Sequence, residues 1–273
     1  MSNIKQKADN LKSMPSNTQI DIELDHITHF FEKNKKPFKV LQDITTKINK
    51  NEFISIIGPS GCGKSTLLFV IAGFIKPTEG VVRYRGKVIQ GPSKDRGVVF
   101  QADAVFPWLT VRGNIEFGLK SLKLSKEERN KIVTDYIKLV GLEGSDNLYP
   151  KQLSGGMRKR VDVARTFAIN PSVLLLDESF GSLDAQTKAN LQVELLNLWE
   201  REKKTALFVT HDIEEAIFLA DKVFVMGTNP GKILEVIDIP FGRPRNKELK
   251  FELEFAKLRR HLVDLIENIG GNV

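Results

Sequence analysis

A glycine-rich stretch, GPSGCGKST at residues 58–66, carries the clearest chemistry in the sequence. It matches the spacing G-x-x-x-x-G-K-[ST], follows an apolar run and opens a helical pattern. Glycines at this spacing let backbone N–H groups approach phosphates at the N-terminus of a helix. Lys64 reaches the β- and γ-phosphates in such a loop, and Ser65 offers its hydroxyl to Mg²⁺. We predict that the nucleotide is bound by Gly58, Pro59, Ser60, Gly61, Cys62, Gly63, Lys64, Ser65 and Thr66.

The lone cysteine of the chain, Cys62, lies inside this loop. The N–H groups of a helix N-terminus and a neighbouring lysine both favour the thiolate form of a cysteine. We therefore expect Cys62 to react readily with thiol reagents and to be protected by bound nucleotide.

Two adjacent acids end the apolar run VLLLDES at residues 173–179. Asp177, at the end of a buried strand, is placed to hold Mg²⁺ through water, and Glu178 can take a proton from an attacking water. The alternative is an acidic helix cap. The phosphate loop elsewhere in the chain favours the catalytic interpretation.

Two single polar residues follow predicted strands, Gln101 after VVF and His211 after ALFVT. A lone histidine is more often a surface or core residue than a functional one. However, both residues lie just past the carboxyl ends of parallel strands, where ligands bind in such sheets. That position makes both of them candidates for the site.

The stretch QLSGGMRKR at residues 152–160 resembles a second anion-binding helix N-terminus. Ser154 is the expected cap, and Gly155 and Gly156 leave the backbone bare ahead of a basic first turn. The chain already has a phosphate loop at residues 58–66, so the sequence by itself leaves open which phosphate this second helix end would hold.

Alternating apolar strands and helices must position these residues, and they indicate an α/β fold with a mostly parallel sheet covered on both faces. The strand-like alternation from residue 20 to 57 adds an N-terminal antiparallel β region. A helical subdomain, about 102–165, is inserted between strands. Within it, Ser125 and Glu128 form a capping box, and one helix face is expected to carry Ile132, Tyr136, Leu139 and Val140.

The two ends of the chain differ in character. Residues 1–18 are polar and are expected to form a flexible arm. The last segment, 247–273, is expected to form a helix that packs on its own domain, because apolar residues recur at helical spacing. They are Phe255, Leu258, Leu262, Leu265 and Ile269.

Composition narrows the class of protein. The 273 residues carry a net charge of +7, but Lys and Arg are spread thinly, which favours a solvated surface over a nucleic-acid face. No apolar run is long enough to span a membrane, and the N-terminus lacks the apolar core of a signal peptide. A single cysteine suits a reducing compartment, so we expect a cytosolic location.

Five motifs of the sequence, taken in order, resemble those of the ATP-binding subunit of an ABC transporter. They are GPSGCGKST, VVFQ, LSGGMRKR, VLLLDESFGSLD and FVTHD. The resemblance covers about residues 20–245, and LSGG is specific to that superfamily. It implies an ABC ATPase domain at 19–246. It also implies that two copies sandwich ATP head to tail, with LSGG of one copy covering the γ-phosphate held by the other.

The resemblance also assigns roles to single residues. An aromatic side chain should stack on adenine, and Phe31 stands at the matching place with Phe30 beside it. Glu178 becomes the catalytic base, and His211 the residue that contacts the γ-phosphate. Asp184 matches a conserved loop of the family, and the expected metal ligands are Ser65, Gln101 and Asp177.

Two residues depart from the family pattern. Ser179 stands where the family usually has proline, so the turn after Glu178 is expected to be looser. Asp162 replaces a small residue, and nothing in the sequence accounts for it.

The resemblance implies partners as well. The permease should be a separate transmembrane chain, joined by a second copy of this chain and, indirectly, an extracytoplasmic solute-binding protein. Two segments are similar to those of ATP-binding subunits that serve importers of nitrate, sulfonate and taurine. They are FPWLTVRGNI and the tail after residue 238. The protein should therefore lie at the cytoplasmic face of the cell membrane and bind no nucleic acid.

Two other functions remain open at this point: a soluble ABC ATPase acting on nucleic acid or ribosomes, and a nucleotide kinase. A kinase would lack LSGG and the histidine after FVT. For the transporter, we expect the permease to dock around Gln101 and the insert at 103–150. Phe106 and Trp108 are candidate walls of that groove or, alternatively, members of the insert's core.

Overall fold

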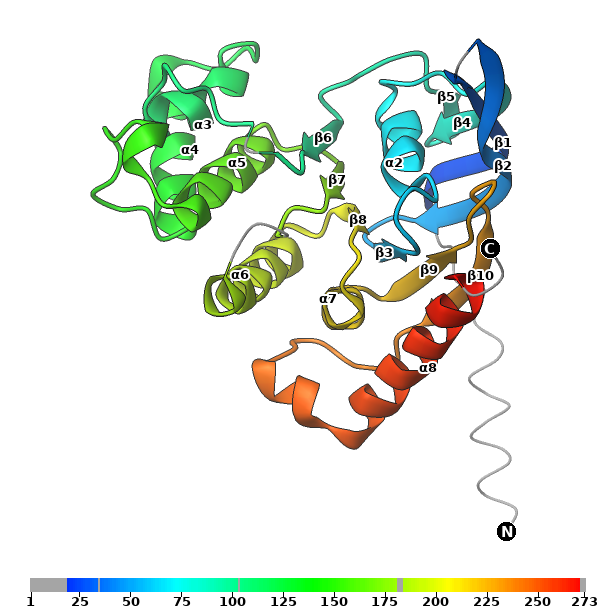
Figure 1. Cartoon of the computed structure of the whole chain (residues 1–273). Coiled ribbons are helices and arrows are strands. Elements are labelled where there is room, and N and C mark those ends of the chain that lie inside the picture. The colour runs from blue at the N-terminus through cyan, green and yellow to red at the C-terminus, as the bar shows by residue number, and fades with distance from the viewer. Residues whose placement is uncertain (1–18, 34, 103, 181–183, 271–273) are drawn as a thin grey trace, which may run out of the picture.

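The computed structural model describes residues 19–33, 35–102, 104–180 and 184–270. The arm predicted for residues 1–18 lies outside these ranges. A lobe built on β-sheets stands beside a smaller helical lobe, with the last helix below the sheets in the view of Figure 1. Across the described ranges, no helix has the length and apolar character needed to traverse a lipid bilayer.

The central sheet has six strands in the order β10–β9–β3–β8–β7–β6. The strands from β9 to β6 are parallel, and β10 pairs antiparallel with β9 at one edge. All residues of β3, β7 and β8 are buried because the sheet is covered on both faces. The predicted α/β class is thus confirmed. The strands are β3 (Phe53–Ile57), β6 (Arg96–Val99), β7 (Val173–Asp177), β8 (Thr205–Val209), β9 (Lys222–Met226) and β10 (Ile233–Asp238).

A second sheet, β2–β1–β4–β5, is antiparallel and forms the predicted N-terminal β region. Helix α2 (Lys64–Ala72) shares one hydrophobic core with Ile22 of this sheet and Ile54 of the central sheet. Because both sheets cover α2, it is apolar on most sides rather than amphipathic. The strands are β1 (Ile20–Lys33), β2 (Lys36–Asn49), β4 (Glu79–Tyr84) and β5 (Lys87–Val88).

The helical lobe contains α3 (Val111–Leu119), α4 (Lys126–Leu139), the 3₁₀ turn η1 (Pro150–Gln152) and α5 (Gly155–Ala168), around a core of its own. The capping box of Ser125 and Glu128 at the start of α4 is confirmed, with both reciprocal hydrogen bonds present. The predicted apolar face of α4 is confirmed in part: Val140 is buried and Ile132, Tyr136 and Leu139 pack partly buried against the cores, but the most buried residues of the helix are Val133 and Ile137.

Helices α6 (Ala185–Glu202) and α7 (Ile213–Leu219) cover the other face of the central sheet in a core that also holds α8 (Leu253–Gly270). The 3₁₀ turn η2 (Lys247–Phe251) precedes α8. Phe255 and Leu262 are fully buried in that core. The tail helix thus packs on its own domain, as its spacing predicts.

Candidate active site

The phosphate loop connects β3 to α2. Gly63 caps α2 with φ at +96°, and a Cβ there would meet Leu41 Cδ2 at 2.8 Å, so glycine is required by both conformation and space. No side chain caps the helix and its first turn holds no acid. The first N–H groups of α2 are therefore free of side-chain acceptors, which suits a bound anion.

Lys64 folds back over this loop. Its Nζ donates to Gly58 O at 2.9 Å and to Pro59 O at 3.0 Å, and only 6% of the residue is exposed. The loop's own carbonyl groups thus hold the ammonium at the centre of the cradle.

Ser65 and Asp177 meet beside the loop, as the sequence predicts for metal ligands. Ser65 Oγ donates to Asp177 Oδ1 at 2.8 Å. Burial raises the pKa of Asp177, the hydrogen bond from Ser65 opposes this, and the nearby Glu178 charge adds to it. A bound cation would stabilise the charged form of this buried carboxylate. No cluster of three His, Cys, Asp or Glu ligands occurs in the described part of the chain, and Mg²⁺ in nucleotide sites needs only one or two protein ligands besides phosphates. The pair fits Mg²⁺.

Glu178, just after β7, lies close to residues that follow two neighbouring strands, β6 and β8. Gln101, after β6, donates from Nε2 to Glu178 Oε2 at 2.8 Å, and His211, after β8, has Nδ1 at 3.6 Å from the same oxygen. The backbone of Glu178 is left-handed, with φ at +39°, and its N–H donates to Val209 O at 2.9 Å. Such a conformation costs about 1–3 kcal/mol in a non-glycine residue and is typical of functional sites.

Phe31 completes the rim of the site. A cavity of 370 Å³ is lined by Phe31, Val40, Ser60, Gly61, Gly63, Lys64, Ser65, Thr66, Gln101 and Glu178. The Phe31 ring meets His29 edge-on at 4.7 Å and is 43% exposed, leaving a face open for stacking. Phe30 does not line the cavity; its ring lies under Lys39 Nζ at 5.3 Å.

Comparison with known proteins identifies the family. The sequence matches the ABC transporter family over residues 41–181. A nitrate import ATP-binding protein of Synechococcus elongatus is 44% identical over 249 residues, 90% of this chain and 91% of that protein. This chain belongs to the ABC transporter family.

Two further comparisons refine that assignment. An aliphatic sulfonates import ATP-binding protein of Bacillus thuringiensis is 43% identical over 249 residues, 91% of this chain and 97% of that protein. A dimeric post-hydrolysis state of an ATP-binding cassette bound to ADP and Pi has a TM-score of 0.72 and 31% identity, covering 81% of this chain and all of that one. The protein is therefore an ABC ATPase of the branch that contains these import ATP-binding proteins.

The signature of this ABC ATPase lies apart from its own phosphate cavity. Ser154 caps α5 and accepts from Met157 N–H at 3.2 Å, and none of Ser154, Gly155 and Gly156 lines the cavity. A Cβ on Gly156 would meet Thr187 Cγ2 at 2.6 Å, so α5 and α6 are in close contact there.

Asp184 lies beside the signature, at the start of α6. It accepts from Thr187 N–H at 3.0 Å, and hydrogen bonds from Thr187 hold its pKa below the usual value. Asp184 does not reach the chain's own cavity. The residues before it in the same loop, 181–183, lie outside the described residues.

The expectation of a reactive Cys62 is wrong. The residue is 1% exposed, and burial raises the pKa of its thiol more than the nearby Lys64 lowers it. The backbone at Gly231, after β9, packs so closely that a Cβ there would lie 2.1 Å from Cys62 O. Residues from several distant segments also enclose Cys62 in the core that surrounds α2, which the loop sequence alone does not show.

Sequence reasoning missed the charged side chains behind the site. Lys188 of α6 forms ion pairs with Asp212 at 2.7 Å and Glu215 at 2.8 Å, next to His211. Its partners lie on another element, so no local pattern indicates them. Asp162, unexplained by the sequence, is fully buried and pairs with Arg165 and Lys159.

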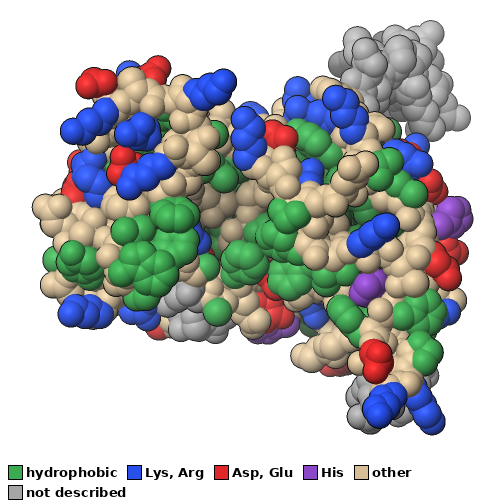
Figure 2. Space-filling view, turned by 90° about the horizontal axis from the view of Figure 1, so that it is seen from above, with side chains coloured by type: hydrophobic (Ala, Val, Ile, Leu, Met, Phe, Trp, Pro, Cys, Tyr) green, Lys and Arg blue, Asp and Glu red, His purple; other side chains and the backbone are tan. Residues whose placement is uncertain are grey.

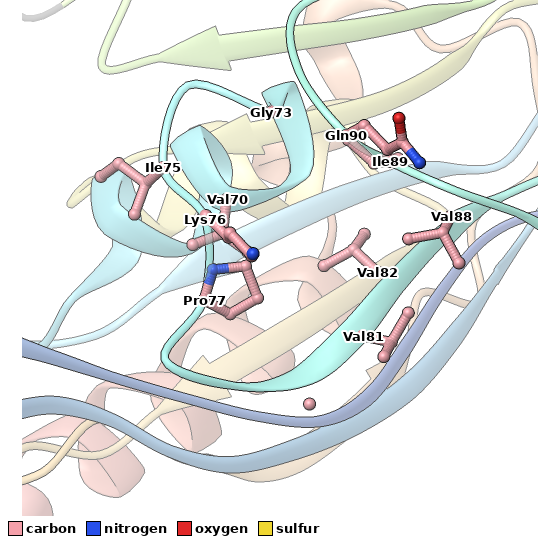
Figure 3. A pocket seen from close by; sticks show the side chains of 11 residues that line it. Val70, Gly73, Ile75, Lys76, Pro77, Val81, Val82, Val88, Ile89 and Gln90 are labelled. Carbon is pink, nitrogen blue, oxygen red and sulfur yellow. The ribbon is translucent and has the colours of Figure 1, made fainter.

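A separate cavity of 410 Å³ lies between the end of α2 and the β4–β5 hairpin (Figure 3). Its walls are mainly aliphatic, including Val70, Val82 and Val88, and Lys76 is the charged residue at its edge. None of the predicted site residues lines it. This cavity is not part of the candidate active site.

Proposed function

We propose that two copies of this ABC ATPase close around two MgATP molecules and drive a separate permease that takes up a small oxyanion such as nitrate, sulfonate or taurine. Relatives named for the import of nitrate and of aliphatic sulfonates support this class of solute. Residues 19–246 would form the ATPase domain, with 102–165 as its helical subdomain and 247–273 as a C-terminal helix. The complex would lie at the cytoplasmic face of the membrane, supplied by an extracytoplasmic solute-binding protein.

The observation that carries the proposal is the split between cavity and signature. Phosphate-loop residues, Gln101 and Glu178 converge on one cavity, while Ser154 at the N-terminus of α5 lies outside it. A phosphate bound by Lys64 and the α2 N–H groups would meet the N-terminus of α5 of another copy. A helix end with two glycines favours the negative charge that a γ-phosphate brings.

Ser65 and Asp177, with Gln101 beside them, would hold Mg²⁺, which neutralises phosphate charge when bound. Phe31 would stack on the adenine ring. Lys64 would keep the terminal phosphates in place with the donors it now shares between Gly58 O and Pro59 O.

Glu178 would act as general base. Its strained backbone fixes the carboxylate at the cavity, where it can take a proton from a water molecule. Gln101 donates to the same carboxylate and orients it. His211 is exposed on 61% of its side chain, so it is free to contact the γ-phosphate once that group is present.

A groove between the two lobes would receive the permease. It has a volume of 600 Å³ and is walled by Phe74, Phe100, Phe106 and Phe117, and the exposed Lys94 is among its lining residues. Figure 2 shows hydrophobic side chains on both sides of the hollow between the lobes. These walls suit a short permease helix that carries apolar side chains and an acidic residue. The Trp108 ring lies tilted against the Phe106 ring, with 5.4 Å between their centroids, and Trp108 is exposed, which adds apolar surface beside the groove.

The test is affinity purification of the tagged protein from detergent-solubilised membranes. We expect an integral membrane protein in equal amount, and ATP hydrolysis that rises when the complex is reconstituted with its anion. Recovery of ribosomes or nucleic acid, with no membrane protein, would instead support the soluble ABC ATPase.

A further inference from the structure

Three charged side chains of α5 form a buried cluster, the α5 charge triad of Lys159, Asp162 and Arg165. Lys159 and Asp162 are 1% and 0% exposed. Asp162 Oδ1 lies 2.6 Å from Arg165 Nη2, and Asp162 Oδ2 lies 3.7 Å from Lys159 Nζ. A buried charge is tolerated only when it is paired and hydrogen-bonded. Asp162 thus accepts a hydrogen bond from Arg165 and lies within ion-pair distance of Lys159.

Each cation of the triad reaches the backbone on one side of Gln101. Lys159 Nζ donates to Phe100 O at 2.8 Å, one residue before Gln101. Arg165 Nη1 donates to Ala104 O at 2.6 Å, three residues after it, and the guanidinium lies 5.1 Å from the centre of the Phe106 ring. One helix thus fixes the chain on both sides of the glutamine.

This anchoring bears on catalysis because Gln101 contacts Glu178, the proposed general base. Its Nε2 donates to Glu178 Oε2 at 2.8 Å, so the backbone position of Gln101 decides whether that bond forms. Helix α5 also begins at the signature serine, Ser154. The triad therefore links the helix that would contact the second copy's ATP to the residue that orients the base.

We propose that Asp162 is a positioning residue that sets Gln101 against Glu178 through Lys159 and Arg165. The inference rests on the proposed function for its catalytic consequence, but not for the anchoring itself. It gives a role to the one signature-helix residue that departs from the family pattern.

Asp162→Asn tests the proposal, because asparagine keeps the volume and removes the charge. We expect kcat for ATP hydrolysis to fall about tenfold while KM for ATP stays within about twofold, since the phosphate loop is untouched. Hydrogen exchange of the peptide containing Gln101 and Phe106 should accelerate about tenfold, with β7 and β8 unchanged. Added to Gln101→Ala, the substitution should cause no further loss of kcat.

Two additional variants make the result decisive. The control is Glu194→Gln on α6, which removes the ion-pair partner of Arg160, another charged residue of α5. Because Arg160 does not contact the Gln101 segment, this variant should leave hydrogen exchange and kcat unchanged. If Asp162→Asn does not fold, Lys159→Met with Asp162→Ala removes both buried charges and should show the same acceleration of exchange. Unchanged exchange around Gln101, or losses of kcat that multiply with Gln101→Ala, would overturn the proposal. If the wild type failed to hydrolyse ATP, the proposed function would fail while the exchange result still decided the anchoring.

Discussion

At the scale of single residues, the left-handed backbone of Glu178 explains how this carboxylate reaches the cavity while its neighbours stay in the core. Asp177 before it is 4% exposed, and Ser179 and Phe180 after it are 0% and 1% exposed. Ser179 stands where the family usually has proline, and it is enclosed by the core. The strain therefore falls on Glu178 and directs its side chain outward.

Glu178→Gln should bind MgATP and hydrolyse it at least about a hundredfold more slowly, because the amide cannot take a proton. Steady-state phosphate release and a nucleotide-binding titration measure the two effects. Turnover close to that of the wild type would exclude Glu178 as the base.

Cys62 should react slowly with maleimide, about tenfold slower than a small free thiol at neutral pH, because it is buried. Since its pKa is raised, the thiolate fraction at any given pH is smaller, and the rate should keep rising at pH values where a free thiol has levelled off. Timed mass spectrometry over a pH series measures this. Denaturant should restore a fast reaction, and Cys62→Ser should remain unmodified.

At the scale of elements, α8 attaches to the sheet lobe through one face. Phe255 and Leu262 point into the core, whereas Leu253 at the start of the same helix is 68% exposed. Arg245, ahead of η2, fixes the approach to the helix by donating to three carbonyl groups at the end of α7, those of Ile217, Phe218 and Ala220. The tail is thus part of the folded domain.

Leu262→Ala should lower the free energy of unfolding by about 2–5 kcal/mol, since it leaves a cavity beneath a fully buried side chain. The matched control on the same helix, Leu253→Ala, should change it by no more than about 0.5 kcal/mol. Urea denaturation followed by tryptophan fluorescence compares them. Equal losses would show that α8 does not depend on its buried face.

Trp108→Ala should reduce solute uptake by the reconstituted complex at least tenfold, on the scale of a docking hot spot. Because Trp108 is 68% exposed, the folding and the ATPase activity of the isolated chain should stay near wild type. Parallel uptake and phosphate-release assays separate the two. A joint fall of both activities together with the unfolding temperature would place Trp108 in the core of the lobe instead.

At the scale of the whole molecule, local sequence patterns predicted those features of the fold and site that lie within a single strand–loop–helix unit. The position of Lys64 over the phosphate loop follows directly from the loop motif. The meeting of Gln101 with Glu178, 77 residues apart, follows from parallel strands that end at one edge. The burial of Cys62 and the backbone partners of Lys159 and Arg165 could not be predicted, because the core around Cys62 and the carbonyl groups of Phe100 and Ala104 are brought in from other elements.

Mixing two inactive variants tests the assembly of the site. Lys64→Ala disables the phosphate loop, and Gly155→Asp places a repelling charge at the signature. Each variant alone should stay monomeric with ATP. A mixture pairs one intact phosphate loop with one intact signature, so ATP-dependent dimers should appear by light scattering. A mixture that stays monomeric while both proteins are folded would contradict the head-to-tail arrangement.

The position of Ser154 outside its own chain's cavity bears on when the protein would consume ATP in the cell. In the proposed head-to-tail dimer, each chain would supply half of a site, so specific activity would depend on protein concentration and free copies at low concentration should leave cellular ATP untouched. Two copies held on one permease would meet at an effective concentration in the millimolar range. Dividing the site between chains would thereby confine ATP consumption to assembled transporters.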